Sequence, residues 1–134
     1  MSDNRNAKGY ERKVTAAERF FGHSPFAIVT MILRIKGHVS EEMLRRAVTA
    51  VQQRHALLRV RIQTRAGDAL WFTSAGVGQI PIEVVPRESE DDWVKIHAQA
   101  ARLPFEFQTR PAIRFVLVRS PDRCDVIILC HHII

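Results

Sequence analysis

The last apolar segment constrains the fold of this chain most strongly. Four consecutive apolar residues, Val126 to Leu129, lead through Cys130 into two adjacent histidines, His131 and His132. A strand covered on both faces has an unbroken apolar run, whereas a half-exposed strand alternates apolar and polar residues. The run therefore predicts a buried, central strand that ends at a histidine pair.

Helical patterns supply the layers that such a strand needs. Residue types that cap helices, followed by acidic residues and apolar stripes of 3.6-residue period, predict three helices, over residues 15–21, 40–54 and 89–103. Thr15 and Glu18 have the spacing of a capping box in the first helix. Ser40 and Ser89 are the predicted caps of the other two, and Pro104 ends the third.

Strand patterns fill most of the remaining chain. They predict strands over residues 26–36, 58–63, 69–73, 82–85 and 112–119, and a last one from Asp125 onward. Residues 66–68 predict a hairpin turn between the second and third of these. The polar residues 1–13 predict a flexible tail, which leaves 14–134 as one domain. The order of elements predicts an α+β fold, an α/β sandwich with a mixed sheet packed against helices.

Charge and composition narrow the function without fixing it. The net charge of +6 indicates either an acidic partner or a solvated basic surface. The basic residues do not interleave with aromatics as a nucleic-acid groove requires, so nucleic acid is not an expected partner. No apolar run approaches the ~20 residues of a membrane span. The absence of an apolar leader in the sequence and the two cysteines, Cys124 and Cys130, predict a cytoplasmic protein.

The histidine pair does not have the pattern of a metal site. Successive side chains of a strand point to opposite faces, so His131 and His132 cannot easily chelate one ion, and no metal is expected. Cys130 and His132 share a face, but i and i+2 on a strand are roughly 6.5 Å apart, too far for nucleophile activation. Cys130 is therefore interpreted as a core residue. Taken alone, the two histidines could simply end a strand.

Three blocks of sequence, in order, give the pair a more specific meaning. Residues 37–59 contain a long helix and Arg54-His55 followed by Leu58-Arg59; residues 103–106 (Leu-Pro-Phe-Glu) precede Arg110 to Val118; and residues 125–132 end in the histidines. Over about residues 15–134 the chain resembles the condensation-domain and CoA-dependent acyltransferase superfamily, whose signature motif is HHxxxDG.

The resemblance implies a chloramphenicol acetyltransferase-like fold with two subdomains and a channel between them. It implies that His132, the second motif histidine, is the base that activates a hydroxyl or amine acceptor for direct attack on an acyl thioester. An imidazole can accept a proton near neutral pH. His131 would serve packing, and the motif aspartate would form a salt bridge to an arginine, for which Arg59 is a candidate. The alternative is that Arg59 is an exposed strand residue, with Arg61 and Arg65 on the same face.

The same resemblance predicts an acyltransferase that uses an acyl-CoA or a phosphopantetheinyl carrier-protein thioester as donor, with no covalently bound cofactor. Glu18-Arg19 resembles the opening of stand-alone acyltransferases and slightly favours ester over amide formation. The sequence contains only the first two motif residues. We therefore expect an incomplete N-terminal subdomain, inactive alone, whose partner is the remainder of the same domain.

Three origins are open for such an incomplete domain: a piece of a longer polypeptide, which we favour, a chain completed in trans, or a degenerate product. Two other functions remain open as well. One is a non-catalytic interaction module of the same fold that binds an acyl carrier protein or a partner chain. The other is an unrelated binder of nucleic acid or a small ligand.

Overall fold

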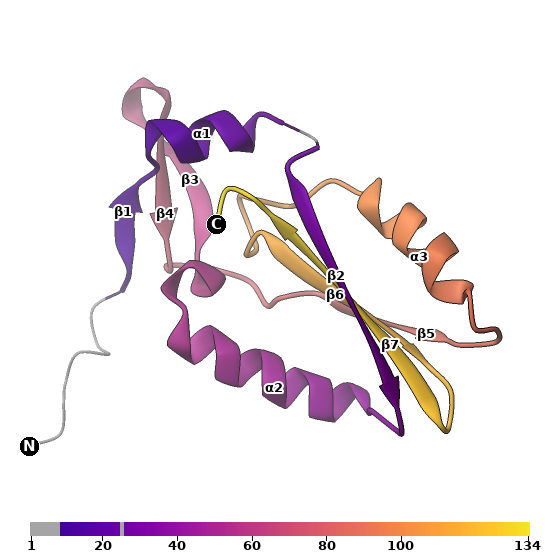
Figure 1. Cartoon of the computed structure of the whole chain (residues 1–134). Helices are drawn as coiled ribbons and strands as arrows, with labels where there is room; N and C mark the ends of the chain where they lie inside the picture. Colours follow the sequence, from indigo (N-terminus) through magenta and orange to yellow (C-terminus); the bar gives the residue numbers. More distant parts are fainter. Residues whose placement is uncertain (1–8, 25) are drawn as a thin grey trace, which may run out of the picture.

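The computed structural model describes residues 9–24 and 26–134 (Figure 1). In chain order the elements are β1 (Glu11–Lys13), α1 (Ala16–Gly22), β2 (Ile28–Lys36), α2 (Glu41–Arg54), the 3₁₀ turn η1 (Ala56–Arg59), β3 (Arg61–Arg65), the 3₁₀ turn η2 (Ala66–Asp68), β4 (Ala69–Thr73), β5 (Ile82–Pro86), α3 (Asp92–Ala101), β6 (Ile113–Arg119) and β7 (Arg123–His131). The predicted α+β architecture is confirmed.

Two sheets divide the strands. A four-stranded sheet has the order β2-β7-β6-β5, and a three-stranded sheet has the order β1-β4-β3. The larger sheet is mixed, because β5 and β6 are parallel while its other pairs are antiparallel. The apolar run of β7 lies between β2 and β6, as expected of a strand with both edges paired.

The two longer helices cover opposite faces of the larger sheet. On one face α3 packs through Trp93, Ile96 and Ala100 against Ile127 and Leu129 of β7. On the other face α2 packs through Leu44 and Val48, and the residues opposite them on β7 are Val126 and Ile128. Because side chains alternate along β7, its odd-numbered residues face α3 and its even-numbered residues face α2. Because helices cover β7 on both faces, both its odd-numbered and its even-numbered residues between Val126 and Leu129 must be apolar.

Local signals at the first two helices are confirmed. The Thr15 hydroxyl accepts a hydrogen bond from the Glu18 amide (3.3 Å), and the Glu18 carboxylate accepts one from the Thr15 amide (2.8 Å). The Ser40 hydroxyl accepts a hydrogen bond from the Met43 amide (3.1 Å).

The third helix begins later than its sequence pattern predicted. Its N-cap residue is Asp91, not Ser89, and the Ser89 amide and hydroxyl both donate to the Asp92 carboxylate. That carboxylate also accepts a hydrogen bond from the Glu88 amide. The local competition by a side chain for backbone donors explains the shift.

Other boundaries also differ from the prediction; β2, for example, begins at Ile28 rather than at Phe26. Glu11–Lys13 form β1, paired with β4, so the predicted tail is wrong for this segment, while residues 1–8 lie outside the described part. Leu58 and Arg59 belong to η1 rather than to a strand. His132 lies in a turn after β7 and not in the strand. The hairpin turn is confirmed: Gly67 (φ 72°) and Asp68 (φ 58°) adopt the left-handed conformation it requires.

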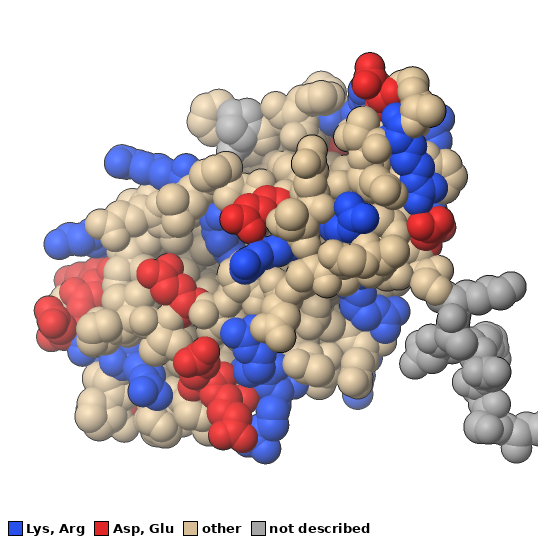
Figure 2. All heavy atoms as spheres, turned by 180° about the vertical axis from the view of Figure 1, so that it is seen from behind, with Lys and Arg blue, Asp and Glu red and all other residues tan. Residues whose placement is uncertain are grey.

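No helix in the described part of the chain is long and apolar enough to cross a membrane. Charged side chains of both signs are interspersed on the face seen in Figure 2, where the basic residues form no continuous stripe. On that face, therefore, basic and acidic residues are mixed rather than gathered into one large basic area.

Candidate active site

His131, the last residue of β7, is buried and fully hydrogen-bonded. Its Nδ1 accepts a hydrogen bond from the Ile133 amide (3.2 Å), so the proton resides on Nε2, which donates to the Ser24 carbonyl (3.1 Å). The rings of Phe105 and Phe107 meet the imidazole edge to face. Burial lowers the pKa of His131, so the neutral tautomer that these contacts require is favoured.

His132 lies in the opposite environment. It is exposed in the turn after β7, and its amide donates to the carbonyl of Ala27 (2.7 Å). Its imidazole stacks on the ring of Phe21, with centroids 5.1 Å apart. The backbone and one aromatic ring thus fix the position of His132 while its ring nitrogens have no partner in the described residues.

Helix α1 and the loop after it hold both histidines. Phe21 contacts one ring and Ser24 the other, while a Cβ at Gly22 would lie 2.8 Å from Cδ1 of Ile133. The missing side chain of Gly22 lets the end of α1 approach the histidine turn closely. The first helix is therefore part of the site.

Arg59 and Cys130 do not join the histidine pair. The Arg59 guanidinium donates to the carbonyl of Gln53 (3.0 Å). A salt bridge between Arg59 and the motif aspartate therefore stays a prediction. Cys130 is half-buried on the α2 face, and burial raises the pKa of its thiol. A raised pKa disfavours the thiolate, in agreement with a packing role.

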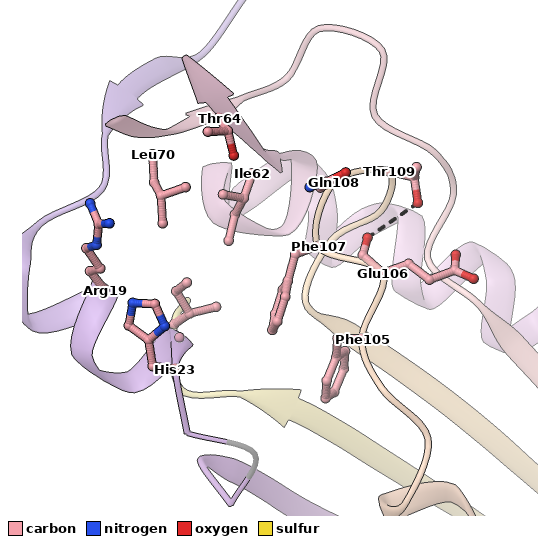
Figure 3. Close-up of a pocket in the computed structure, with 12 residues that line it drawn as sticks. Arg19, His23, Ile62, Thr64, Leu70, Phe105, Glu106, Phe107, Gln108 and Thr109 are labelled. Carbon is pink, nitrogen blue, oxygen red and sulfur yellow. Dashed lines mark hydrogen bonds between the residues drawn. The ribbon is translucent and has the colours of Figure 1, made fainter. Parts of the chain in front are cut away.

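A cavity of about 630 Å³ opens beside the histidine turn. Figure 3 shows Arg19 of α1 and His23, which directly follows the helix, on one wall, with Phe105 and Phe107 across from them. Ile62 and Leu70 add apolar surface from the β3–β4 hairpin. No group of three or more His, Cys, Asp or Glu side chains within the described ranges could hold a metal ion.

The sequence did not indicate the aromatic residues around His131. Phe105 fell within the block that carried the family resemblance, but nothing in that block predicted its contact with the histidine. Phe21 and Ser24 carried no signal of their own, because their contacts join residues more than a hundred positions apart. Only the close packing of α1 against β7 reveals these contacts.

Fold and site together define a class of protein. The profile of the condensation-domain family matches residues 11–134, and the chain belongs to that family. The predicted superfamily and its chloramphenicol acetyltransferase-like fold are thereby confirmed.

The relatives include large peptide synthetases. The chain is 29% identical over 110 residues to nonribosomal peptide synthetase TES of Alternaria alternata and 25% identical over 140 aligned residues to cyclosporin synthetase simA of Tolypocladium inflatum. These alignments cover 80% and 100% of this chain but only 2% and 1% of the respective relatives. The chain thus spans a small part of these relatives.

Solved structures show the same fold. The tallysomycin biosynthesis protein TlmII superposes with a TM-score of 0.71 at 20% identity, over 91% of this chain and 33% of that one. The condensation domain of the Monacolin K polyketide synthase MokA superposes with a TM-score of 0.75 at 14% identity, over 91% of this chain and 30% of that one.

Proposed function

We propose that the chain is the histidine-bearing part of a condensation domain that forms amide bonds from carrier-bound acyl thioesters. Family membership and the similarity to peptide synthetases support this proposal. The same relatives lead us to propose an amine acceptor, although the sequence alone slightly favoured a hydroxyl. The rest of the domain, which completes the channel, is the first partner of this segment.

In the proposed reaction, His132 is the base. The acceptor nitrogen attacks the thioester carbonyl while the imidazole accepts a proton from that nitrogen. A C–N bond forms, the C–S bond breaks, and the proton passes to the departing thiolate. The observation that carries the assignment is the exposed imidazole of His132, which stacks on the Phe21 ring while the His132 amide donates to the Ala27 carbonyl. A positioned base typically contributes 10²–10⁴-fold.

His131 and Arg59 have supporting roles in the proposal. His131 fixes the turn by accepting a hydrogen bond from the Ile133 amide, and Arg59 is the proposed salt-bridge partner of the motif aspartate. We further propose that the cavity lined by Ile62, Leu70 and Phe107 receives an apolar part of a substrate. Its position next to Ile133 puts it beside the base.

The proposed donor is a thioester on a phosphopantetheinyl carrier protein. The excess of basic residues suits an acidic carrier surface. Carrier binding should therefore weaken as ionic strength increases. Binding that does not change between low and high salt would argue against this partner.

The test of the base is a single-turnover assay on the polypeptide that carries this segment within a complete domain. We expect His132→Gln to reduce amide formation by roughly 10²–10⁴-fold without changing carrier binding. His38→Gln is the matched control, because His38 is also exposed but lies outside the site. Unchanged turnover in His132→Gln would remove His132 from the mechanism. Carrier binding by a wild type that shows no turnover would favour the non-catalytic module.

A further inference from the structure

A second pocket, lined mainly by charged residues, lies at the end of the larger sheet remote from the histidines. Asp125 and His131 lie on the same face of β7, six residues or roughly 20 Å apart along the strand. The pocket has a volume of about 150 Å³. Its charged lining residues are Arg34, Lys36, Arg87, Glu90, Arg123 and Asp125.

The first observation that indicates a ligand in this pocket is the partly unpaired guanidinium of Arg87. Its side chain is only 10% exposed, and its Nε donates to Oδ2 of Asp125 (3.2 Å). Its remaining guanidinium donors have no acceptor among residues 9–24 and 26–134. Arg34 differs, since it donates both to Oδ1 of Asp125 (3.1 Å) and to the Glu90 carbonyl (2.8 Å). Buried side-chain donors without a partner occur in the described residues only at Trp93 and Arg114, so the free donors of Arg87 reach the solvent in the pocket. An incoming anion can therefore bind them as an acceptor.

The pairing of β2 with β7 provides the second sign. Lys36 lies directly opposite Arg123 in the antiparallel register, two pairs beyond Arg34 and Asp125. Like charges placed directly opposite each other destabilise a sheet. Neither side chain has a carboxylate partner in the part of the chain that the structure describes. An anion between them would relieve the repulsion.

Charge and volume indicate which anion fits. Four cationic side chains face the carboxylates of Glu90 and Asp125, which leaves two positive charges uncompensated. A phosphate monoester carries −1.5 to −2 charges near neutral pH, and a guanidinium can bind its oxygens in pairs. A volume of about 150 Å³ holds roughly five waters, which suits one phosphate group but not a nucleotide.

We infer that this pocket is a phosphate-binding site, with Arg87 as the central donor and with Lys36 and Arg123 at its rim. Asp125 orients the guanidinium of Arg87, and the Glu90 carboxylate approaches Arg34 at 4.0 Å. The site is separate from the histidine pair, and the inference does not rest on the proposed function.

Binding of inorganic phosphate to the full chain, followed by melting temperature and by titration calorimetry, tests the inference. We expect a saturable rise in melting temperature that sodium chloride of equal ionic strength does not reproduce. Arg87→Lys keeps the charge but loses the paired donors, and it should weaken binding by about tenfold. A phosphate effect no greater than that of chloride would overturn the inference.

Substitutions at exposed positions test the site without the risk that the variant fails to fold. Lys36→Gln and Arg123→Gln should each weaken phosphate binding by about fivefold, and both should leave the unliganded protein as stable as the wild type or more so. Arg102→Gln is the control, because Arg102 is an exposed cation at the other end of α3. An equal loss of phosphate affinity in Arg102→Gln would show that the effect comes from the overall charge of the protein, and it would contradict a specific site at this pocket.

The source of the phosphate is distinguished by competition with coenzyme A, which carries a phosphate monoester. Displacement of inorganic phosphate by coenzyme A supports a site for a phosphate borne on a larger molecule. Binding of inorganic phosphate without such displacement supports a site for the free ion.

Discussion

The imidazole of His132 stacks on the ring of Phe21, with centroids 5.1 Å apart and ring planes inclined by 24°. The contact joins the first helix of the chain to the turn after its last strand. It leaves the ring nitrogens of His132 free of partners in the described residues, while the plane of the ring is set by the stacking contact. An orientation set in advance is what a base needs for proton transfer.

Replacing Phe21 by leucine should therefore slow catalysis without unfolding the domain. Leucine keeps an apolar contact but loses the flat surface on which the imidazole lies. We expect roughly a tenfold lower single-turnover rate in the complete domain, because small misplacements of a reacting group are costly. Phe20→Leu is the control, since Phe20 is 74% exposed and does not stack on His132. Equal rates for both variants would show that the stacking contact has no role.

Replacing His131 by phenylalanine should lower stability. The substitution keeps a ring against Phe105 and Phe107 but leaves the Ser24 carbonyl and the Ile133 amide without their partners. We expect a loss of about 1–3 kcal/mol in the free energy of unfolding, measured in urea. His38→Asn, at an exposed position, should change it by less than about 0.5 kcal/mol. A His131→Phe variant as stable as the wild type would contradict the described hydrogen bonds.

The stability of the protein should also decrease in mild acid because of His131. Burial lowers the pKa of His131 in the folded state, so the unfolded chain binds a proton more readily. The stabilising contribution is therefore complete above the unfolded pKa of about 6.5 and is lost as the pH falls through and below that value. Urea unfolding at about pH 7.5 and about pH 5.5 should show a larger decrease for wild type than for His131→Phe. The same decrease in both proteins would assign it to other groups.

Filling the cavity beside the histidine turn should interfere with substrate binding. Thr64 is an exposed residue at the cavity, so a tryptophan there can occupy the space without disturbing the core. We expect Thr64→Trp to raise KM for the substrate that enters the cavity, with a smaller effect on kcat. Gln63→Trp places the same ring on the opposite face of β3 and should change neither. If Thr64→Trp leaves KM unchanged, no substrate enters the cavity.

Much of the fold could be predicted because the local signals agreed with the final packing. The apolar run of β7 required cover on both faces, and the stripes of α2 and α3 supply it. The prediction was wrong where a nearby side chain or a distant strand decided the outcome. The Asp92 carboxylate accepts hydrogen bonds from the Glu88 and Ser89 amides, so α3 begins at Asp92 and Ser89 does not cap it. Pairing with β4 orders Glu11–Lys13 into a strand.

The site was less predictable than the fold. The adjacent histidines were visible in the sequence, and the expectation that they lie in different environments was correct. The reason given for it was wrong, because His132 lies in the turn after β7 and not in the strand. Their surroundings were not visible, because Phe21, Ser24 and Phe107 reach the pair only through tertiary packing. The basic residues of the remote pocket also gave no sequence signal, since they come from separate strands and adjoining loops.

The central claim is that a polypeptide containing this segment in a complete condensation domain joins an acyl thioester to an amine. Intact-mass measurement of the two carrier proteins after one turnover tests it most directly, with matched amine and hydroxyl acceptors. We predict that the donor acyl group moves to the amine acceptor, which gains the mass of that group while the donor carrier loses it. Transfer to the hydroxyl acceptor alone, or an acyl group that stays on its donor carrier, would contradict the claim.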